Sequence, residues 1–135
     1  MKKKICIVIS SYYPEISKNL FLGAKNSLNK KGITNIKKID APGVFEIPVI
    51  IAKNINKYDA FVALGCVIKG KTPHFDFISN AAINGIMNLS IKYNKPIGNG
   101  ILTCLNKKQA LARSKPKLKD KGGEASRAML MVLEI

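Results

Sequence analysis

The sequence predicts a three-layer α/β protein, in which a parallel β-sheet lies between two layers of helices. Short β-branched runs alternate along the chain with segments whose apolar residues recur at helical spacing, and the links between them are only a few residues long. Strands that alternate with helices form βαβ units, whose strands run parallel. The length of 135 residues suits one domain over residues 1–135, and it excludes a two-domain protein.

The first half of the chain supplies two strands and two helices. Residues 5–10 form a β-branched run that ends at a Ser-Ser-Tyr-Tyr-Pro loop, as a buried strand does. Apolar residues at helical spacing predict a helix over residues 16–28, and Gly32 stops it. Residues 33–40 are predicted as the second strand, which an Ala-Pro-Gly turn follows. A short helix then begins at Pro48, because proline is tolerated in a first helical turn.

The second half continues the alternation. Residues 60–68 are nearly all apolar, which is typical of a central strand covered on both faces. A loop leads to a long helix over residues 75–93 with an apolar inner stripe, and residues 96–103 are predicted as the fourth strand. Two helical segments close the chain, one at residues 107–113 and one at residues 124–133.

Four strands in such a chain are expected in the flavodoxin-like order 2-1-3-4, with helices on both faces of the sheet. Ligands in these sheets bind beyond the carboxyl ends of the strands, near the switch between strands 1 and 3. The fold class therefore predicts the place of a site before its chemistry is considered. The loops at this edge are residues 10–14, 40–46, 69–74 and the segment after Thr103.

The net charge is +15, from 23 Lys plus Arg against 8 Asp plus Glu, and 21 of the basic residues are Lys. Surfaces that read bases or bind phosphates with two parallel hydrogen bonds usually rely on Arg, and only Arg113 and Arg127 occur here. Lys, Ile and Asn are abundant throughout, which favours a solvated Lys-rich surface. The field still attracts anions, whatever its origin.

No membrane span or signal peptide is expected. No stretch approaches the roughly 20 apolar residues of a span, and the basic start leads into only a short apolar run. We therefore predict a cytoplasmic protein. Cys6, Cys66 and Cys104 lie far apart among apolar neighbours, which predicts reduced, buried thiols. With one His and no CxxC pair, no metal site is expected.

His74, the only histidine, lies at the mouth of the third strand, just before a helix. A lone histidine is commonly a surface or capping residue. Here it stands beside Gly70 and Thr72, whose backbone N–H and hydroxyl groups could hold an anion together with the helix start. A histidine next to bound phosphate can take and give protons near neutral pH. No GxGxxG follows the first strand, so dinucleotides lose support as ligands.

Other candidates at this edge each have a structural alternative. Glu46 either places charge favourably at a helix N-terminus or recognises ligand hydroxyls. Tyr12 and Tyr13 either stack on a flat ring or cover the sheet edge. Arg113 could bind a phosphate with two hydrogen bonds, whereas the lysines at alternate positions over 115–121 form a charge run of a kind that is usually solvated.

Three segments of the chain carry specific motifs. They read GVFEIP at residues 43–48, LGCVIKGKTPHFD at residues 64–76, and QALAR at residues 109–113, with Lys-Gly at 121–122. In this order, over essentially the whole chain, they resemble the 6,7-dimethyl-8-ribityllumazine synthase family. The resemblance implies condensation of 5-amino-6-(D-ribitylamino)uracil with 3,4-dihydroxy-2-butanone 4-phosphate, the penultimate step of riboflavin biosynthesis, without a metal or organic cofactor.

The resemblance also implies roles for individual residues. His74 would move protons during imine formation, loss of phosphate and ring closure. Tyr12 would stack on the pyrimidine, and Glu46 would accept hydrogen bonds from ribityl hydroxyls. The pyrimidine and its ribityl chain would be bound by Tyr12, Val44, Phe45, Glu46, Cys66, Val67, Ile68 and Asn99. The phosphate would be held by Lys71, Thr72 and Arg113, with Lys69, Gly70 and Lys121 nearby.

Three places depart from the family's usual pattern. Lys69 stands where Arg is usual, which keeps the charge but loses the forked geometry. Asn99 stands where an aromatic residue from the neighbouring subunit usually lies, and residues 114–117 replace a Gly-containing stretch. The family's site lies between subunits of a pentamer, and some members assemble into shells of sixty subunits. We therefore expect a homo-oligomer with shared sites, a pentamer whose further assembly into a shell is left open, and riboflavin synthase as a further candidate partner.

Two other functions are compatible with the sequence. One is a non-catalytic flavodoxin-like binding module, because the fold alone does not define an activity. The other is a small basic nucleic-acid-binding protein, although the chain lacks a recognisable module and interleaved aromatic residues. The resemblance favours the enzyme, with small-molecule substrates and with neither nucleic acid nor membrane as a partner.

Overall fold

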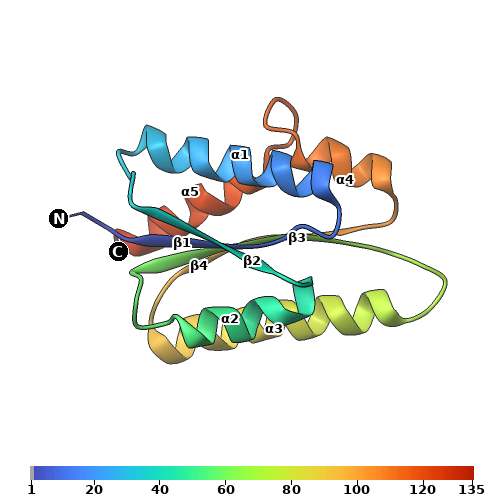
Figure 1. Cartoon of the computed structure of the whole chain (residues 1–135), viewed down its shortest axis with the longest axis horizontal. Helices are drawn as coiled ribbons and strands as arrows, with labels where there is room; N and C mark the ends of the chain where they lie inside the picture. The colour runs from blue at the N-terminus through green and yellow to red at the C-terminus, as the bar shows by residue number, and fades with distance from the viewer. Residues whose placement is uncertain (1) are drawn as a thin grey trace.

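Four parallel strands form one sheet in the computed structural model, which describes residues 2–135 (Figure 1). They are β1 (Ile5–Ser10), β2 (Ile36–Ala41), β3 (Ala60–Ile68) and β4 (Ile97–Cys104). Their order is β2-β1-β3-β4, and every pairing is parallel. The predicted fold class and strand order are therefore confirmed.

Helices cover both faces of the sheet, as predicted. The helical segments are α1 (Pro14–Lys30), the short 3-10 helix η1 (Val44–Glu46), α2 (Ile47–Lys53), α3 (His74–Tyr93), α4 (Lys107–Ser114) and α5 (Lys121–Leu133). Helices α1, α4 and α5 lie on one face, and α2 and α3 lie on the other (Figure 1). The sheet is therefore the middle layer of three.

Strand β3 occupies the centre of the sheet. Leu64 of β3 pairs with Ile9 of β1, and Gly65 of β3 pairs with Ile101 of β4. All but the last of its nine residues are buried. This burial explains the continuous apolar run in the sequence, because helices cover the strand on both faces.

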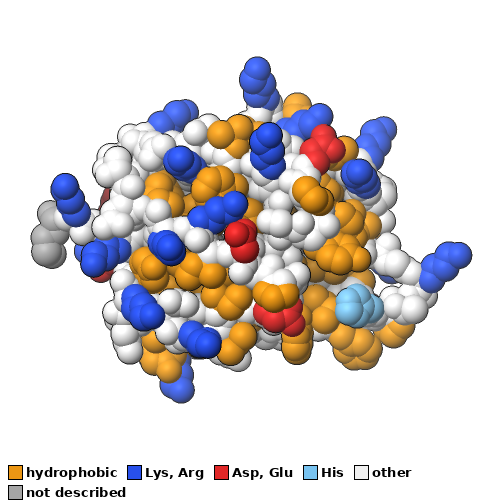
Figure 2. Space-filling view, in the orientation of Figure 1, with side chains coloured by type: hydrophobic (Ala, Val, Ile, Leu, Met, Phe, Trp, Pro, Cys, Tyr) orange, Lys and Arg blue, Asp and Glu red, His pale blue; other side chains and the backbone are white. Residues whose placement is uncertain are grey.

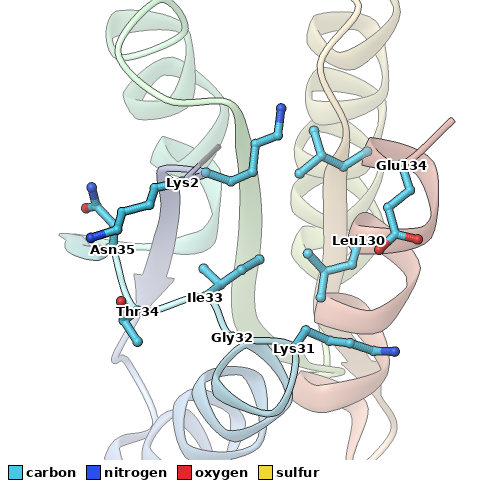
Figure 3. Close-up of a pocket in the computed structure, with 10 residues that line it drawn as sticks. Lys2, Lys31, Gly32, Ile33, Thr34, Asn35, Leu130 and Glu134 are labelled. Atoms are coloured by element: carbon cyan, nitrogen blue, oxygen red, sulfur yellow. The ribbon is translucent and has the colours of Figure 1, made fainter.

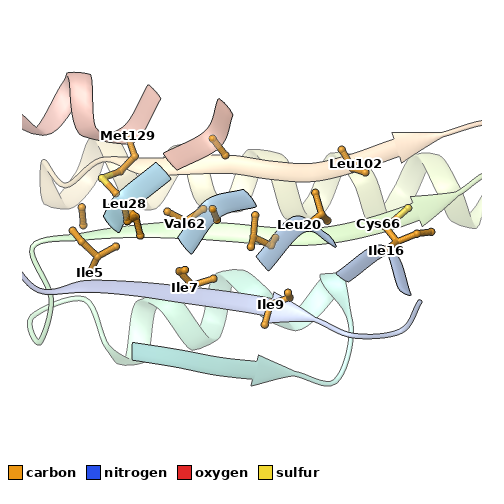
Figure 4. Packing of buried hydrophobic residues seen from close by; sticks show 14 of the residues in the cluster. Ile5, Ile7, Ile9, Ile16, Leu20, Leu28, Val62, Cys66, Leu102 and Met129 are labelled. Atoms are coloured by element: carbon orange, nitrogen blue, oxygen red, sulfur yellow. The ribbon is translucent and has the colours of Figure 1, made fainter. Parts of the chain in front are cut away.

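The core consists of two apolar layers separated by the sheet. On β1, Ile5, Ile7 and Ile9 face α1 and α5 (Figure 4), whereas Cys6 and Val8 face α2. Successive side chains of a strand point to opposite faces, so one unbroken apolar strand supplies both layers. The first layer is completed by residues that include Leu20, Leu28, Val62, Leu102 and Met129.

Strand β2 begins at Ile36, later than the predicted start at residue 33. Helix α1 ends at Lys30, and Ile33 is still bonded to the end of that helix. Gly32 takes the left-handed conformation with φ 79°, and the amide of Ile33 donates to the carbonyl oxygen of Leu28 at 3.0 Å. Such a bond satisfies a carbonyl at the helix C-terminus. Because the amide of Ile33 is used in this way, pairing with β1 begins further along the chain, at Ile36.

Helix α5 begins at Lys121, earlier than the predicted start at residue 124. Asp120 caps it, with its side chain accepting from the amide of Gly123 at 3.2 Å. A Cβ on Gly122 would collide with the carbonyl oxygen of Leu20 in α1. The glycines in this first turn therefore permit close packing of α1 on α5 and do not interrupt the helix. Other boundaries differ from prediction by one or two residues, within the usual uncertainty of helix ends.

Basic side chains are spread over the surface. On the face in Figure 2, Lys and Arg side chains lie across the whole outline, with few acidic side chains among them. Within residues 2–135 the ion pairs are Lys38–Asp40, Lys121–Glu124 and Arg127–Asp120. This distribution fits the Lys-rich surface that the composition favours. None of the helices in the same range combines the length and apolarity needed to cross a bilayer.

Candidate functional site

A pocket of about 460 Å³ opens at the carboxyl ends of β1 and β3. This first pocket lies at the predicted edge of the sheet, where β1, η1, β3 and the start of α3 meet. It brings together eight of the predicted site residues. Its lining is Ser10, Tyr12, Tyr13, Pro42, Gly43, Val44, Phe45, Glu46, Cys66, Val67, Ile68, His74 and Ile78.

The two tyrosines after β1 form one wall of the first pocket. Their rings meet edge to face, with centroids 5.0 Å apart and an interplanar angle of 81°. Tyr13 packs against the apolar layer beneath α1, and burial raises the pKa of its phenol, with Cys66 and Tyr12 adding to the rise. Tyr12 is 73% exposed. Tyr13 therefore supports the wall, and the ring of Tyr12 is available for stacking on a flat ligand.

The 3-10 helix η1 forms the opposite wall. Val44 is buried against the core, whereas Phe45 is exposed beside it. A Cβ on Gly43 would lie 3.0 Å from Oε1 of Glu46, so the carboxylate folds back over this glycine. Glu46 also occupies the N-cap position of α2. A helix N-terminus favours the negative charge of Glu46, and the residue also lines the pocket, so its position is compatible with both predicted roles.

The last residues of β3, Cys66 to Ile68, form the inner wall. Cys66 and Val67 are 7% and 9% exposed. Burial raises the pKa of the Cys66 thiol to about 12, and Cys104 adds to the rise. The thiol therefore stays protonated at neutral pH and is no nucleophile. All three cysteines are free and buried, as predicted.

His74 is the first residue of α3 and lines the first pocket with an exposed side chain. Its backbone amide donates to the hydroxyl of Thr72 at 3.5 Å. In Figure 2 the pale-blue histidine lies beside hydrophobic side chains at one end of the molecule. Lys69, Gly70 and Lys71 are exposed in the loop that precedes it, at the rim and outside the lining.

A second pocket of about 440 Å³ lies along the free edge of β4. It holds three further predicted residues, Asn99, Arg113 and Lys121. Nη1 of Arg113 donates to the carbonyl oxygen of Thr103 at 3.3 Å and lies 3.6 Å from Sγ of Cys104. Nζ of Lys121 lies 3.1 Å from a carboxylate oxygen of Glu124. Its lining is Asn99, Gly100, Ile101, Leu102, Thr103, Arg113, Lys119, Lys121 and Glu124.

Asn99 has a local role in the second pocket. Its Oδ1 accepts from the amide of Ile101 at 3.0 Å. Unpaired amides on an edge strand are a template for unwanted pairing, and the Asn99 side chain occupies one of them. The side-chain N–H₂ group remains as a donor toward the pocket.

One chain therefore holds two separate groups of predicted residues. Tyr12, Glu46 and His74 line the first pocket, and Arg113 and Lys121 line the second. Strand β3 pairs with β1 on one side and with β4 on the other, so the free edge of β4 lies away from the β1–β3 switch. The sequence predicted the residues of both groups and a site shared between subunits, but it did not predict that Arg113 lies with Asn99 and apart from His74.

Several lining residues were not predicted. Ser10 is the last residue of the first predicted strand and lies at the edge where ligands bind, so its position in the sequence could have identified it as a site residue. The first pocket is also lined by Pro42, Gly43 and Ile78. Turn geometry and helix packing bring these residues there, and neither can be recognised in the sequence from the chemistry of the side chains. Lys119 lines the second pocket, although the sequence showed it only as part of a charge run.

A third hollow, of about 350 Å³, lies at the other end of the sheet (Figure 3). Residues near both ends of the chain, Lys2 and Glu134, line it together with the turn after α1. It contains none of the predicted residues. Across residues 2–135, no group of three or more His, Cys, Asp and Glu side chains is placed to hold a metal ion.

The doubly wound sheet and the first pocket define the class of protein. In such α/β folds a pocket beyond the carboxyl ends of the strands binds small molecules, and its mixture of apolar walls with a few polar groups is typical of ligand sites.

Comparison with known proteins then identifies the family. The family model for 6,7-dimethyl-8-ribityllumazine synthase matches residues 2–135. The protein of that name from Agrobacterium fabrum is 43% identical over 141 residues, covering 99% of this chain and 95% of the relative. That of Vesicomyosocius okutanii is 41% identical, covering 98% and 84%, and that of Buchnera aphidicola subsp. Baizongia pistaciae is 42% identical, covering 99% and 87%. The chain belongs to the 6,7-dimethyl-8-ribityllumazine synthase family, a family of transferases in riboflavin biosynthesis.

The environment of Cys66 predicts its reactivity. With a pKa of about 12, its thiolate fraction at pH 8 is about a thousandfold below that of an ordinary cysteine. Iodoacetamide at pH 8 should therefore leave Cys66 unlabelled in the folded protein, as peptide mass spectrometry would measure. In concentrated urea all three cysteines should react. Labelling of Cys66 at the same rate in both conditions would contradict its buried, protonated state.

Proposed function

We propose that this chain condenses 5-amino-6-(D-ribitylamino)uracil with 3,4-dihydroxy-2-butanone 4-phosphate at sites formed between neighbouring copies. The family match over residues 2–135 supports the activity. The separation of the predicted residues into two pockets supports the shared site. In this proposal the first pocket of one copy faces the second pocket of its neighbour.

The first pocket binds the pyrimidine in this proposal. The exposed ring of Tyr12 stacks on the heterocycle, and backbone groups of Cys66, Val67 and Ile68 bind the uracil edge. The ribityl chain lies along η1, where the Glu46 carboxylate accepts hydrogen bonds from its hydroxyls. Asn99 of the neighbouring copy closes the site in place of an aromatic residue, with its free N–H₂ group as a polar contact.

The phosphate is held from both sides in this proposal. Lys71 and Thr72, with Lys69 and Gly70 next to them, approach from the loop before α3. Arg113 approaches from the neighbour, and the Thr103 carbonyl occupies only one of its five N–H donors. Lys121 stands close by, but its pairing with Glu124 reduces the charge that it offers to the phosphate.

His74 moves the protons in this mechanism. Attack of the pyrimidine amine on the ketone and loss of water form an imine, phosphate then leaves, and ring closure releases water. Each step needs a proton delivered or removed, which an exposed imidazole can do near neutral pH. Holding two substrates in one pocket supplies much of the remaining rate acceleration. The residues assigned here perform these steps without a metal or organic cofactor.

The oligomer in this proposal is a pentamer. Further assembly of pentamers into a shell, as in some family members, is left open. Family membership supports a homo-oligomer. Exposed apolar side chains along α3 support it further, since Phe77, Met87 and Ile91 are 70%, 58% and 71% exposed and such faces commonly cover one another. Association with riboflavin synthase would be a further contact of this assembly.

The same proposal places the enzyme in the cytoplasm and gives it no nucleic-acid partner. Three buried, free thiols fit a reducing compartment. On the face in Figure 2 the lysines are spread out. This spread fits a solvated surface better than a basic groove that would bind a nucleic-acid strand.

Mixing the assembled protein with the two substrates should produce 6,7-dimethyl-8-ribityllumazine, which its absorbance and fluorescence report. His74→Ala should lower kcat about a hundredfold, because it removes the group that moves protons, and should leave product binding unchanged. Absence of product from intact, assembled protein would contradict the proposed function. An unchanged kcat in the variant would remove His74 from the mechanism.

Arg113→Ala should raise KM for the phosphorylated substrate about 10- to 100-fold, the effect of losing hydrogen bonds between charged groups. KM for the pyrimidine should change little, as steady-state kinetics with each substrate varied in turn would measure. Arg127→Ala is the matched control, because Arg127 contacts Ser27 and Asp120 outside the second pocket. An equal loss for both substrates in Arg113→Ala would argue against a phosphate role.

A further inference from the structure

Ser10 is a buried polar group in the first pocket that the proposed mechanism does not use. It is the last residue of β1, is only 2% exposed, and lines the pocket. Within residues 2–135 its hydroxyl has no hydrogen-bond partner. A buried hydroxyl without a partner is destabilising, and native proteins contain few of them. Its place in a pocket suggests that a ligand supplies the missing hydrogen bond.

Ser10 lies close to η1. Val8 on the same strand faces the α2 side, and alternation along a strand puts Ser10 on that side as well. A Cβ on Gly65, in the neighbouring strand, would lie 3.5 Å from Cβ of Ser10 and 2.8 Å from Cγ2 of Val44. Ser10 and Val44 therefore both lie against the same glycine, and both line the first pocket. A ligand chain bound along η1 would lie near Ser10.

The surroundings limit what the hydroxyl can bind. Val44 and the Cδ1 atom of Ile47 lie around the Gly65 position, so this part of the floor is apolar. Apart from Ser10, the side chain that offers polar atoms along η1 is that of Glu46. An ionised carboxylate only accepts hydrogen bonds, whereas a serine hydroxyl both donates and accepts. Together they match a polyol, whose hydroxyls also do both.

We infer that the Ser10 hydroxyl binds a hydroxyl of the ribityl chain of the pyrimidine substrate and so contributes to selecting a ribityl-bearing ligand. This role rests on the proposed function, because it takes its substrate from there. A rotation about χ1 moves the hydroxyl between staggered positions, so the contact needs no movement of the strand.

The stability of a Ser10 variant distinguishes a structural role of the hydroxyl from a role in ligand binding. In the free protein the hydroxyl has no hydrogen bond to a protein atom, so Ser10→Ala should leave the free energy of unfolding unchanged or higher. Ser79 provides a matched control. It is also buried without a hydrogen-bond partner in the described chain, but it lies in α3 outside the lining of the first pocket.

The test titrates the assembled protein with two fluorescent ligands, 6,7-dimethyl-8-ribityllumazine and 6,7,8-trimethyllumazine, in which a methyl group replaces the ribityl chain. Ser10→Ala should bind the ribityl ligand roughly 3- to 10-fold more weakly, as expected for one hydrogen bond, and bind the methyl analogue as the unmodified protein does. Ser79→Ala should bind both ligands unchanged. Urea unfolding of each variant measures stability in parallel.

Equal binding of the ribityl ligand by Ser10→Ala and the unmodified protein would overturn the inference. A similar loss for both ligands would also overturn it, since the contact would then be to the ring. So would a marked fall in unfolding free energy, which would make the hydroxyl structural. If the unmodified protein failed to bind the ribityl ligand, the proposed function would fail, and the role of Ser10 with it.

Discussion

The pairing of β3 with a strand on each side is the constraint on which the rest of the structure depends. Because β3 is buried on both faces and hydrogen-bonded along both edges, it fixes the positions of β1 and β4 on opposite sides. The ends of β1 and β3 then open into the first pocket, and the outer edge of β4 carries the second. Within one chain, Arg113 and His74 consequently belong to different pockets, and in the proposed enzyme a second copy joins them.

The net charge is +15, but only the few charged side chains at the two pockets are placed to contact a ligand. Of 23 basic residues, few lie at either pocket, and those of the second pocket are partly engaged by Thr103 and Glu124. The remaining lysines give every copy the same sign of charge, which opposes assembly. In the proposed assembly the exposed apolar side chains of α3, together with counter-ions or an acidic partner, would offset that repulsion.

The sequence predicted the strand order, the ligand edge and the residues of both pockets, because periodicity and motif spacing are local properties. It did not predict features that depend on contacts between distant segments. Gly122 lies outside the helix predicted over residues 124–133, yet it belongs to α5 and is needed where α5 passes the Leu20 carbonyl of α1. Ile33 looked like a strand residue, yet its amide closes α1. The separation of Arg113 from His74, and the unpaired hydroxyl of Ser10, likewise follow from tertiary packing alone.

In the proposed enzyme each active site takes His74 from one copy and Arg113 from its neighbour, an arrangement that complementation between two variants can test. His74→Ala and Arg113→Ala chains would be unfolded together in equal amounts, reassembled, and assayed for lumazine formation with the phosphorylated substrate far below the raised KM of Arg113→Ala, where each variant alone is only weakly active. With random mixing about a quarter of the shared sites receive both intact residues, so activity should recover to about that share of the unmodified protein. Activity no greater than the mean of the two variants, in assemblies shown by differential tagging to contain both chains, would contradict the shared site.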